Sequence, residues 1–260
     1  LMTRTVKKSF SRRMKIDNIY LITLDHSQQS YDSLIDRLNR LGVPTGTPYK
    51  IIEGVNGRQL FKTEEGRNEY GIKFYDNWAQ GTNNEWWNRP VTTGEAGGIC
   101  SHIKIWEDAY RNGYENILII EDDFNPIETI DWSVFTELQN YDWDLIFLSR
   151  LLVNHPMVKD FNVGLTNFIR PGYSYQTHCY VLNKSGISKL VETNLQTLKQ
   201  NIIVSDEFLP ATYTWHPRQD LRSMYNQNMS ALALKWNPVS QLRFEAAGNS
   251  QTQPVEGVDF

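Results

Sequence analysis

Residues 116–124 read Asn-Ile-Leu-Ile-Ile-Glu-Asp-Asp-Phe, and this stretch constrains the fold more than any other part of the chain. The unbroken apolar run 117–120 predicts a strand that is covered on both faces, as in a mostly parallel sheet. Three carboxylates, Glu121, Asp122 and Asp123, follow at the carboxyl end of that strand. Open α/β sheets bind their ligands at this end, so the sequence predicts a site there.

The acidic turn has two interpretations. Adjacent carboxylates repel one another unless a cation or hydrogen-bond donors lie between them. Hard oxygen ligands suit Mg²⁺ or Mn²⁺, and either cation can bridge to a diphosphate. The other interpretation is a solvated turn that binds nothing. The rest of the chain has to decide between them.

The composition excludes several classes of protein. The chain has 260 residues and is 40% hydrophobic, enough for one large domain or two small ones. Its net charge of −4 gives no basic field for nucleic acid, and no apolar run of about eighteen residues predicts a membrane span. Cys100 and Cys179 make neither a disulfide framework nor a zinc site.

The first part of the chain predicts a β-α-β unit. The expected elements are a strand at 19–24, a helix at 31–41 that ends at Gly42, and a strand at 49–52. Such a unit begins many nucleotide-binding sheets, although this sequence has no glycine-rich phosphate loop. Residues 1–13 are basic and lack the apolar part of a signal peptide, so we expect a flexible arm. We expect a single domain over 14–260, since no repeat or linker divides it.

A polar segment follows at 65–90, and it contains Trp78, Trp86 and Trp87. It is long for a loop of a compact domain, so we expect a lid or a binding loop. A lid of this kind would pack weakly until a ligand orders it.

A glycine-rich segment, 94–98, opens a helix expected at 99–110 that carries His102 and Trp106 on one face. A histidine there is either a structural residue or, beside a glycine-rich helix start, a contact to phosphate or ribose. Further strands are expected at 143–148 and 172–182, and a short helix at 185–192.

A second pair of carboxylates, Asp206 and Glu207, lies in the stretch 204–210 with Ser205 as a helix-capping residue. Acids at a helix start often only complement the helix dipole. A structural role and a catalytic role are therefore both open for this pair.

These motifs, taken in order, resemble glycosyltransferase family 25. The motifs are Tyr-Leu-Ile-Thr-Leu at 20–24, Gly-Glu-x-Gly at 94–97, Ser-His-x-x-x-Trp at 101–106, Ile-Ile-Glu-Asp-Asp at 119–123 and Ser-Asp-Glu-Phe-Leu-Pro at 205–210. Within the family, Trp143-Asp-Leu-Ile, Tyr173-Ser-Tyr and His216-Pro217 are most similar to the procollagen galactosyltransferases, which modify hydroxylysine. The resemblance runs from about residue 20 to 217.

The resemblance implies an α/β fold of the GT-A type, with a Rossmann-like, mixed and mostly parallel sheet flanked by helices. It implies Mn²⁺ or Mg²⁺ as cofactor and a UDP-hexose donor, carrying galactose or, alternatively, glucose. It also implies transfer with inversion to an acceptor hydroxyl. The expected acceptor is hydroxylysine of a collagen-like protein, with a glycan or lipopolysaccharide as the alternative.

The matching motifs also assign residues to roles. The expected metal ligands are Asp123 and Glu121. The expected donor contacts are Thr23, Asp25, Glu95, Ser101, His102, Glu121 and Asp122. The expected acceptor contacts are Tyr175 and Trp215. The catalytic base is expected to be Asp206 or Glu207, and the shorter Asp206 is favoured because it loses less rotamer freedom when it is held in place.

Two differences from the family pattern affect the expected contacts to the donor phosphates and a third group of residues that would bind the metal or the acceptor. Ser30 and Tyr31 stand where members often carry arginines, and Ser250-Gln-Thr-Gln253 replaces a late acidic motif.

Three functions remain in competition: a metal-dependent glycosyltransferase, a metal-dependent phosphohydrolase or nucleotidyltransferase, and a catalytically dead binding relative. An intracellular location is expected, or the endoplasmic reticulum lumen if a signal peptide was removed, and a homodimer stays open.

Overall fold

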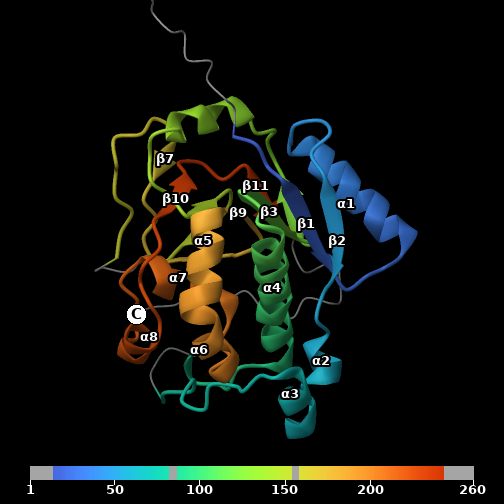
Figure 1. Ribbon diagram of the computed structural model, residues 1–260, viewed down its shortest axis with the longest axis vertical. Coiled ribbons are helices and arrows are strands. Elements are labelled where there is room, and N and C mark those ends of the chain that lie inside the picture. Colours follow the sequence, from blue (N-terminus) through green and yellow to red (C-terminus); the bar gives the residue numbers. More distant parts are fainter. Residues whose placement is uncertain (1–13, 82–86, 154–157, 243–260) are drawn as a thin grey trace, which may run out of the picture.

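A computed structural model describes residues 14–81, 87–153 and 158–242, and a seven-stranded sheet lies at its centre (Figure 1). The sheet has the order β2-β1-β3-β9-β5-β10-β7. Its strands are β1 Asn18–Thr23, β2 Tyr49–Glu53, β3 Asn116–Glu121, β5 Leu145–Phe147, β7 Phe168–Ile169, β9 Cys179–Asn183 and β10 Ala231–Leu234. Five strands run in one direction, and β9 and β7 run against them. The predicted mixed, mostly parallel sheet is confirmed.

Two short antiparallel ribbons complete the strands. They pair β4 Phe124–Pro126 with β11 Val239–Gln241, and β6 Leu151–Leu152 with β8 Ser174–Tyr175. The helices are α1 Gln28–Arg40, α2 Gly57–Leu60, α3 Glu64–Tyr70, α4 Thr93–Asn112, α5 Lys184–Ser188, α6 Leu195–Gln200, α7 Ser205–Tyr213 and α8 Gln219–Met224. A 3₁₀ segment, η2 Trp132–Leu138, and a π-helical turn, η3 Lys189–Asn194, accompany them. Among these helices none has the length and apolar character needed to cross a membrane.

Strand β3 is covered on both faces, as its apolar run predicts. Ile117 and Ile119 belong to the core beneath α4 and α7, on the face turned to the viewer in Figure 1. Leu118 and Ile120 belong to the opposite core, beneath α1 and η2. Burial on both faces fixes the strand, so the turn that follows it has a defined position.

Helix α4 begins earlier than expected, because a capping box fixes its start at Thr92 and Glu95. The glycine-rich start does not form a phosphate loop. A Cβ atom on Gly97 would lie 2.4 Å from the Val55 carbonyl oxygen, and one on Gly57 would lie 1.9 Å from the Thr93 carbonyl oxygen. These glycines therefore allow the backbones of α2 and α4 to approach closely.

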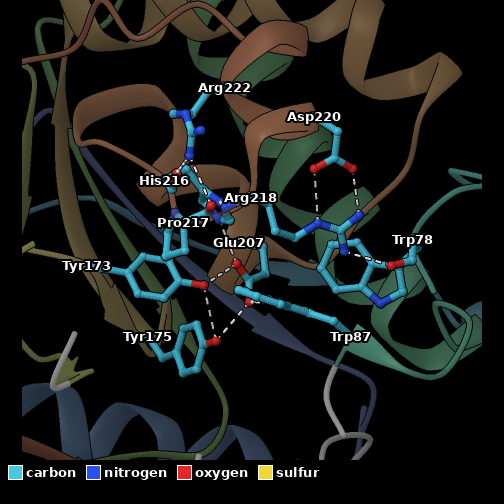
Figure 2. Close-up of polar contacts among 10 residues, drawn as sticks. All are labelled: Trp78, Trp87, Tyr173, Tyr175, Glu207, His216, Pro217, Arg218, Asp220 and Arg222. Carbon is cyan, nitrogen blue, oxygen red and sulfur yellow. Dashed lines mark hydrogen bonds and ion pairs between the residues drawn. The ribbon is translucent and has the colours of Figure 1, made fainter. Parts of the chain in front are cut away.

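The segment 65–90 is packed in the part that the structure describes, contrary to the expectation of a weakly packed lid. Trp78 is 1% exposed and Trp87 is 8% exposed. The Arg218 guanidinium lies 4.6 Å from the Trp78 ring centre and 5.7 Å from the Trp87 ring centre, and it donates to the Trp78 carbonyl at 2.7 Å (Figure 2). Trp86 lies outside the described residues, as do the predicted arm at 1–13 and the motif at 250–253.

The strand expected at 172–182 is two strands, β8 and β9, because the backbone turns at Gln176. This residue has φ of 75°, the left-handed region that residues other than glycine and asparagine rarely adopt. The turn places Gln176 and Thr177 at the same end of the sheet as the acidic turn after β3.

Candidate functional site

The acidic turn lies at the carboxyl ends of β1 and β3, which pair in parallel with Ile22 opposite Glu121. The Thr23 hydroxyl donates to Asp122 Oδ2 at 2.8 Å and accepts from the Asp25 N–H at 3.0 Å. Three of the predicted donor residues are thus brought together at the edge where open α/β sheets bind ligands. Their contact with a nucleotide sugar stays a prediction.

Asp123 has one carboxylate oxygen without a hydrogen-bond partner. Its Oδ2 accepts from Gln241 Nε2 at 3.0 Å, whereas Oδ1 is buried and unpaired among the described residues. Burial, followed by the charges of Glu121 and Asp122, holds the pKa of Asp123 well above its usual range. A cation at Oδ1 would satisfy this oxygen and favour the ionised carboxylate, so the site fits a metal ion.

The described residues do not surround that position with protein ligands. Among them no group of three or more His, Cys, Asp and Glu side chains is placed to hold a metal ion. Mg²⁺ and Mn²⁺ sites often have only one or two carboxylates, with substrate oxygens and water as the other ligands. Asp123 is the side chain that would hold the ion, and a contribution of Glu121 as the second ligand stays a prediction.

Glu121 is held by His102. Its Oε1 accepts from His102 Nε2 at 3.0 Å and from the Thr177 hydroxyl at 3.3 Å. On the other side of the imidazole, the Tyr180 hydroxyl lies 2.8 Å from Nδ1. Burial raises the pKa of Glu121, but the hydrogen bond from His102 and the neighbouring imidazoles outweigh it, and the pKa lies below its usual value. His102 therefore positions Glu121, and its predicted contact with the donor stays a prediction.

Asp206 belongs to the same site as Glu121. The Gln176 N–H and the Thr177 hydroxyl both interact with the Asp206 carboxylate, and Thr177 also contacts Glu121. Burial, and then the negative charge of Glu121, raises the pKa of Asp206 to about 7. A carboxylate with this pKa has the proton affinity of a general base that works near neutral pH.

Glu207 is 0% exposed and lies in a different environment (Figure 2). Its carboxylate accepts hydrogen bonds from Trp87 Nε1 at 3.0 Å, the Tyr175 hydroxyl at 2.8 Å, His216 Nε2 at 2.6 Å and the Tyr173 hydroxyl. Burial raises its pKa, but these donors, His216 first, outweigh burial and hold the pKa below its usual value. An ionised carboxylate has about four acceptor positions, and four donors fill them. These contacts are those of a structural residue, and Asp206 stays the predicted base.

Two predicted donor residues also make structural contacts. The Glu95 carboxylate accepts from the Thr92 N–H at 2.8 Å and from both terminal nitrogens of Arg89 at 2.6 and 2.9 Å. The buried Ser101 hydroxyl donates to the Gly97 carbonyl at 2.8 Å and accepts from the Val55 N–H at 2.8 Å. These contacts fix the start of α4, and contact of either side chain with a donor stays a prediction.

The two predicted acceptor residues differ in position. Tyr175 is half-buried, and the charges of Glu207 and Asp206 contribute to the raised pKa of its hydroxyl, after burial. Its hydroxyl donates to Glu207 at 2.8 Å, and its contact with an acceptor stays a prediction. Trp215 is 42% exposed, and the Arg222 guanidinium lies 4.3 Å from its ring centre. Its contact with an acceptor also stays a prediction.

Arg37 and Gln241 are site residues that the motifs did not identify. Arg37 is 7% exposed on α1, and its NH1 atom donates to the carbonyls of Asp122 at 2.7 Å and Phe124 at 2.5 Å. One signal was present for Arg37, because it lies three residues after Leu34, on the apolar face of the helix. A cation on that face needs a buried partner.

With the fold and the site established, comparison with known proteins identifies the family. The profile described as "Glycosyltransferase family 25 (LPS biosynthesis protein)" matches residues 16–209. The match covers most of the chain, and the chain belongs to glycosyltransferase family 25. The family expected from the motifs is confirmed.

The individual curated relatives have less than 30% sequence identity to this chain. "Procollagen galactosyltransferase 1-B" of Xenopus laevis is 29% identical over 229 residues, which are 85% of this chain and 35% of that protein. "Probable inactive glycosyltransferase 25 family member 3" of Bos taurus is 27% identical over 220 residues, 82% of this chain and 34% of that protein. The chain thus spans about a third of the length of the curated relatives it matches. Among solved structures, that of mannose-1-phosphate geranyltransferase from Thermus thermophilus is similar to this chain with a TM-score of 0.37 and 12% sequence identity. The comparison covers 85% of this chain and 74% of that one. A TM-score of this size is too low to indicate a close structural relationship.

Proposed function

We propose that the chain is a metal-dependent, inverting glycosyltransferase that moves a hexose from a UDP-hexose to an acceptor hydroxyl. The observation that carries this proposal is the meeting of two acidic motifs from distant parts of the sequence. The Thr177 hydroxyl lies 3.3 Å from Glu121 Oε1, at the end of β3, and 2.9 Å from the hydroxyl of Ser205, the residue before Asp206 at the start of α7. One motif is suited to the diphosphate and its cation, and the other supplies a base beside it.

The chain's own residues would bind the donor and move one proton. Thr23 and Asp122 would orient the nucleotide end of the donor at the carboxyl edge of the sheet, and Asp123 would hold the cation. The acceptor oxygen bonds to the anomeric carbon from the face opposite the diphosphate. The bond from that carbon to the diphosphate oxygen breaks, its electrons leave with UDP, and the acceptor proton passes to the Asp206 carboxylate.

A bound Mn²⁺ or Mg²⁺ would supply the positive charge that stabilises the departing diphosphate. The buried, unpaired Oδ1 of Asp123 supports the presence of such an ion. A phosphohydrolase or nucleotidyltransferase would also use a cation, but family membership favours transfer of a sugar.

For the substrates, the names of the relatives give the best guide. The Xenopus relative is named a procollagen galactosyltransferase, so we propose UDP-galactose as donor, with UDP-glucose as the alternative. We propose hydroxylysine of a collagen-like protein as acceptor, and a glycan as the alternative. We propose Tyr175, whose hydroxyl donates to Glu207 at 2.8 Å, as a contact of the acceptor.

The test is a transfer assay on the purified chain. UDP-galactose and UDP-glucose are each offered with a hydroxylysine-containing collagen-like peptide or with glycan acceptors, in Mn²⁺ or in EDTA, and glycosylated product is measured by mass spectrometry. Product that requires Mn²⁺ and is lost in Asp206→Asn supports the proposal. Release of UDP and free sugar at the same rate with and without acceptor would instead indicate a hydrolase.

A second candidate is a family member that binds sugar nucleotides without turnover. It is favoured by the similarity to the Bos taurus protein, whose name describes it as a probable inactive member. Thermal stabilisation by UDP-hexose and Mn²⁺, without product from any acceptor, would support this candidate. A ligand at 100 times its Kd adds about 2.7 kcal/mol, which is easily measured.

A further inference from the structure

We propose that Gln241 is a positioning residue that fixes the Asp123 carboxylate so that Oδ1 faces a divalent cation. This inference rests on the proposed function, because it concerns the same metal site. Gln241 comes from the last described strand, far from the acidic motif in sequence, and it does not belong to any of the motifs that define the family resemblance.

The contact is a direct one from strand β11. Gln241 Nε2 donates to Asp123 Oδ2 at 3.0 Å, and the next residue, Leu242, donates its N–H to the Asp123 carbonyl at 2.7 Å. β11 pairs with β4, with Gln241 opposite Phe124, so the strand is held directly beside the acidic turn. The main chain and the side chain of Asp123 are thus both bound by this strand.

Arg37 holds the turn from the other side. Its guanidinium donates to the carbonyls of Asp122 and Phe124, and it lies 4.9 Å from the Phe124 ring centre. These bonds fix the backbone on both sides of Asp123, but they do not fix the rotation of the carboxylate. The last torsion of an aspartate is broad, so a separate contact has to select its orientation. Gln241 provides that contact.

The chemistry of the amide suits a site for a cation. A lysine or arginine at this position would neutralise Asp123 and repel a metal ion. The neutral amide of Gln241 occupies Oδ2 without adding charge, which leaves the negative charge of Asp123 and the unpaired Oδ1 for the cation. Groups that orient a ligating carboxylate in this way commonly change metal affinity by about 10–100-fold when they are removed.

The test measures metal binding directly, without turnover. Mn²⁺ is titrated into the full chain, with and without UDP, and the free ion is followed by electron paramagnetic resonance. Gln241→Met keeps the length of the side chain but removes the donor. We expect its Kd for Mn²⁺ to rise about 10-fold or more.

Ser240→Ala is the matched control. Ser240 is the neighbouring residue of β11, and its hydroxyl contacts Asn125 of β4 at 3.2 and 3.3 Å without contacting Asp123. We expect this variant to bind Mn²⁺ with the affinity of the wild type. If Gln241→Met unfolds, Gln241→Asn replaces it, because its shorter amide cannot reach Asp123 and should give the same loss.

The outcomes separate this inference from the proposed function. If the wild type binds Mn²⁺ and the Kd of Gln241→Met lies within twofold of the wild-type Kd, the positioning role of Gln241 is overturned but the proposed function is not. An equal loss in Ser240→Ala would also overturn it, because the β4–β11 ribbon rather than the Asp123 contact would then be responsible. Wild-type protein that binds no Mn²⁺, even with UDP, would overturn both.

Discussion

Replacing Glu207 with glutamine should destabilise the protein, whereas replacing its neighbour Asp206 with asparagine should remove turnover. Glu207 is fully buried, and two donors, His216 and Tyr173, point at its Oε2 atom. If the amide nitrogen of the introduced glutamine takes the place of Oε2, it is itself a donor and cannot accept the hydrogen bonds from His216 and Tyr173. Turning the amide over would create the same conflict with Trp87 and Tyr175 at the other oxygen.

The imidazole has little freedom to adapt to this change. His216 Nδ1 accepts from the Arg218 N–H at 3.1 Å, so its proton is on Nε2, facing Glu207. Moving the proton to Nδ1 would break the contact with Arg218 instead. Each buried donor left without a partner costs about 1–3 kcal/mol, so two of them cost about 2–6 kcal/mol. This is a large part of the roughly 5–15 kcal/mol by which a domain is stable.

Urea unfolding measures the difference. We expect the free energy of unfolding of Glu207→Gln to fall by about 2–6 kcal/mol, and that of Asp206→Asn to change little or to rise at neutral pH. In the transfer assay the folded fraction of Glu207→Gln should retain turnover. The assignment fails if Glu207→Gln is as stable as the wild type, or if it is stable and inactive.

Four further predictions concern the carboxylates and the arginine beside them. Because the pKa of Asp206 is raised to about 7, kcat/KM should increase as pH rises through about 7, and the Asp206→Asn variant should lose this step. The pKa of Asp206 in the folded protein lies above the unfolded value of about 3.9, so the free energy of unfolding should decrease between about pH 4 and 7. Urea titrations at several pH values should show a smaller decrease for Asp206→Asn than for the wild type. Asp123→Asn should lose about 100-fold or more in Mn²⁺-dependent turnover at an unchanged melting temperature, and near wild-type turnover would exclude Asp123 as a metal ligand. Arg37→Met leaves two carbonyls unpaired and should lower the free energy of unfolding by about 2–4 kcal/mol, whereas Arg40→Met, which removes an exposed pair with Asp36, should change it by less than about 1 kcal/mol.

The sequence predicts those parts of the fold that depend on residues adjacent in the chain. The apolar run of β3 and the acids after it lie side by side in the chain, so period and composition locate both the strand and the turn. The contacts of Arg37 and Gln241 are different, because they join residues 85 and 118 positions apart. No local pattern records such a pairing. The pair Asp206 and Glu207 was recognisable as a motif, but only the four donors around Glu207 separate the two roles.

Tryptophans and glycines each allow two interpretations in a sequence. The tryptophans in the segment 65–90 favour a lid or a binding loop, and the glycine-rich start of α4 is compatible with a phosphate contact. Trp78 and Trp87 instead pack against a buried arginine, and Gly97 allows two backbones to approach. An aromatic ring or a missing side chain has the same sequence signature in a core as in a site. Only the three-dimensional neighbours decide which use applies.

The turn at Gln176 connects the structural carboxylate with the proposed catalytic one. Tyr175, before the turn, donates its hydroxyl to Glu207, and Thr177, after it, contacts Glu121 and Ser205. Between them, Gln176 has φ of 75°, a conformation that costs a residue with a side chain about 1–2 kcal/mol. Such a conformation persists only where its surroundings impose it, and here the buried hydrogen bonds to Glu207 anchor one end of the turn. The other end carries the Gln176 N–H, which interacts with Asp206. The turn therefore connects the structural contacts of Glu207 with the surroundings of the proposed base, although Glu207 itself does not serve as the base.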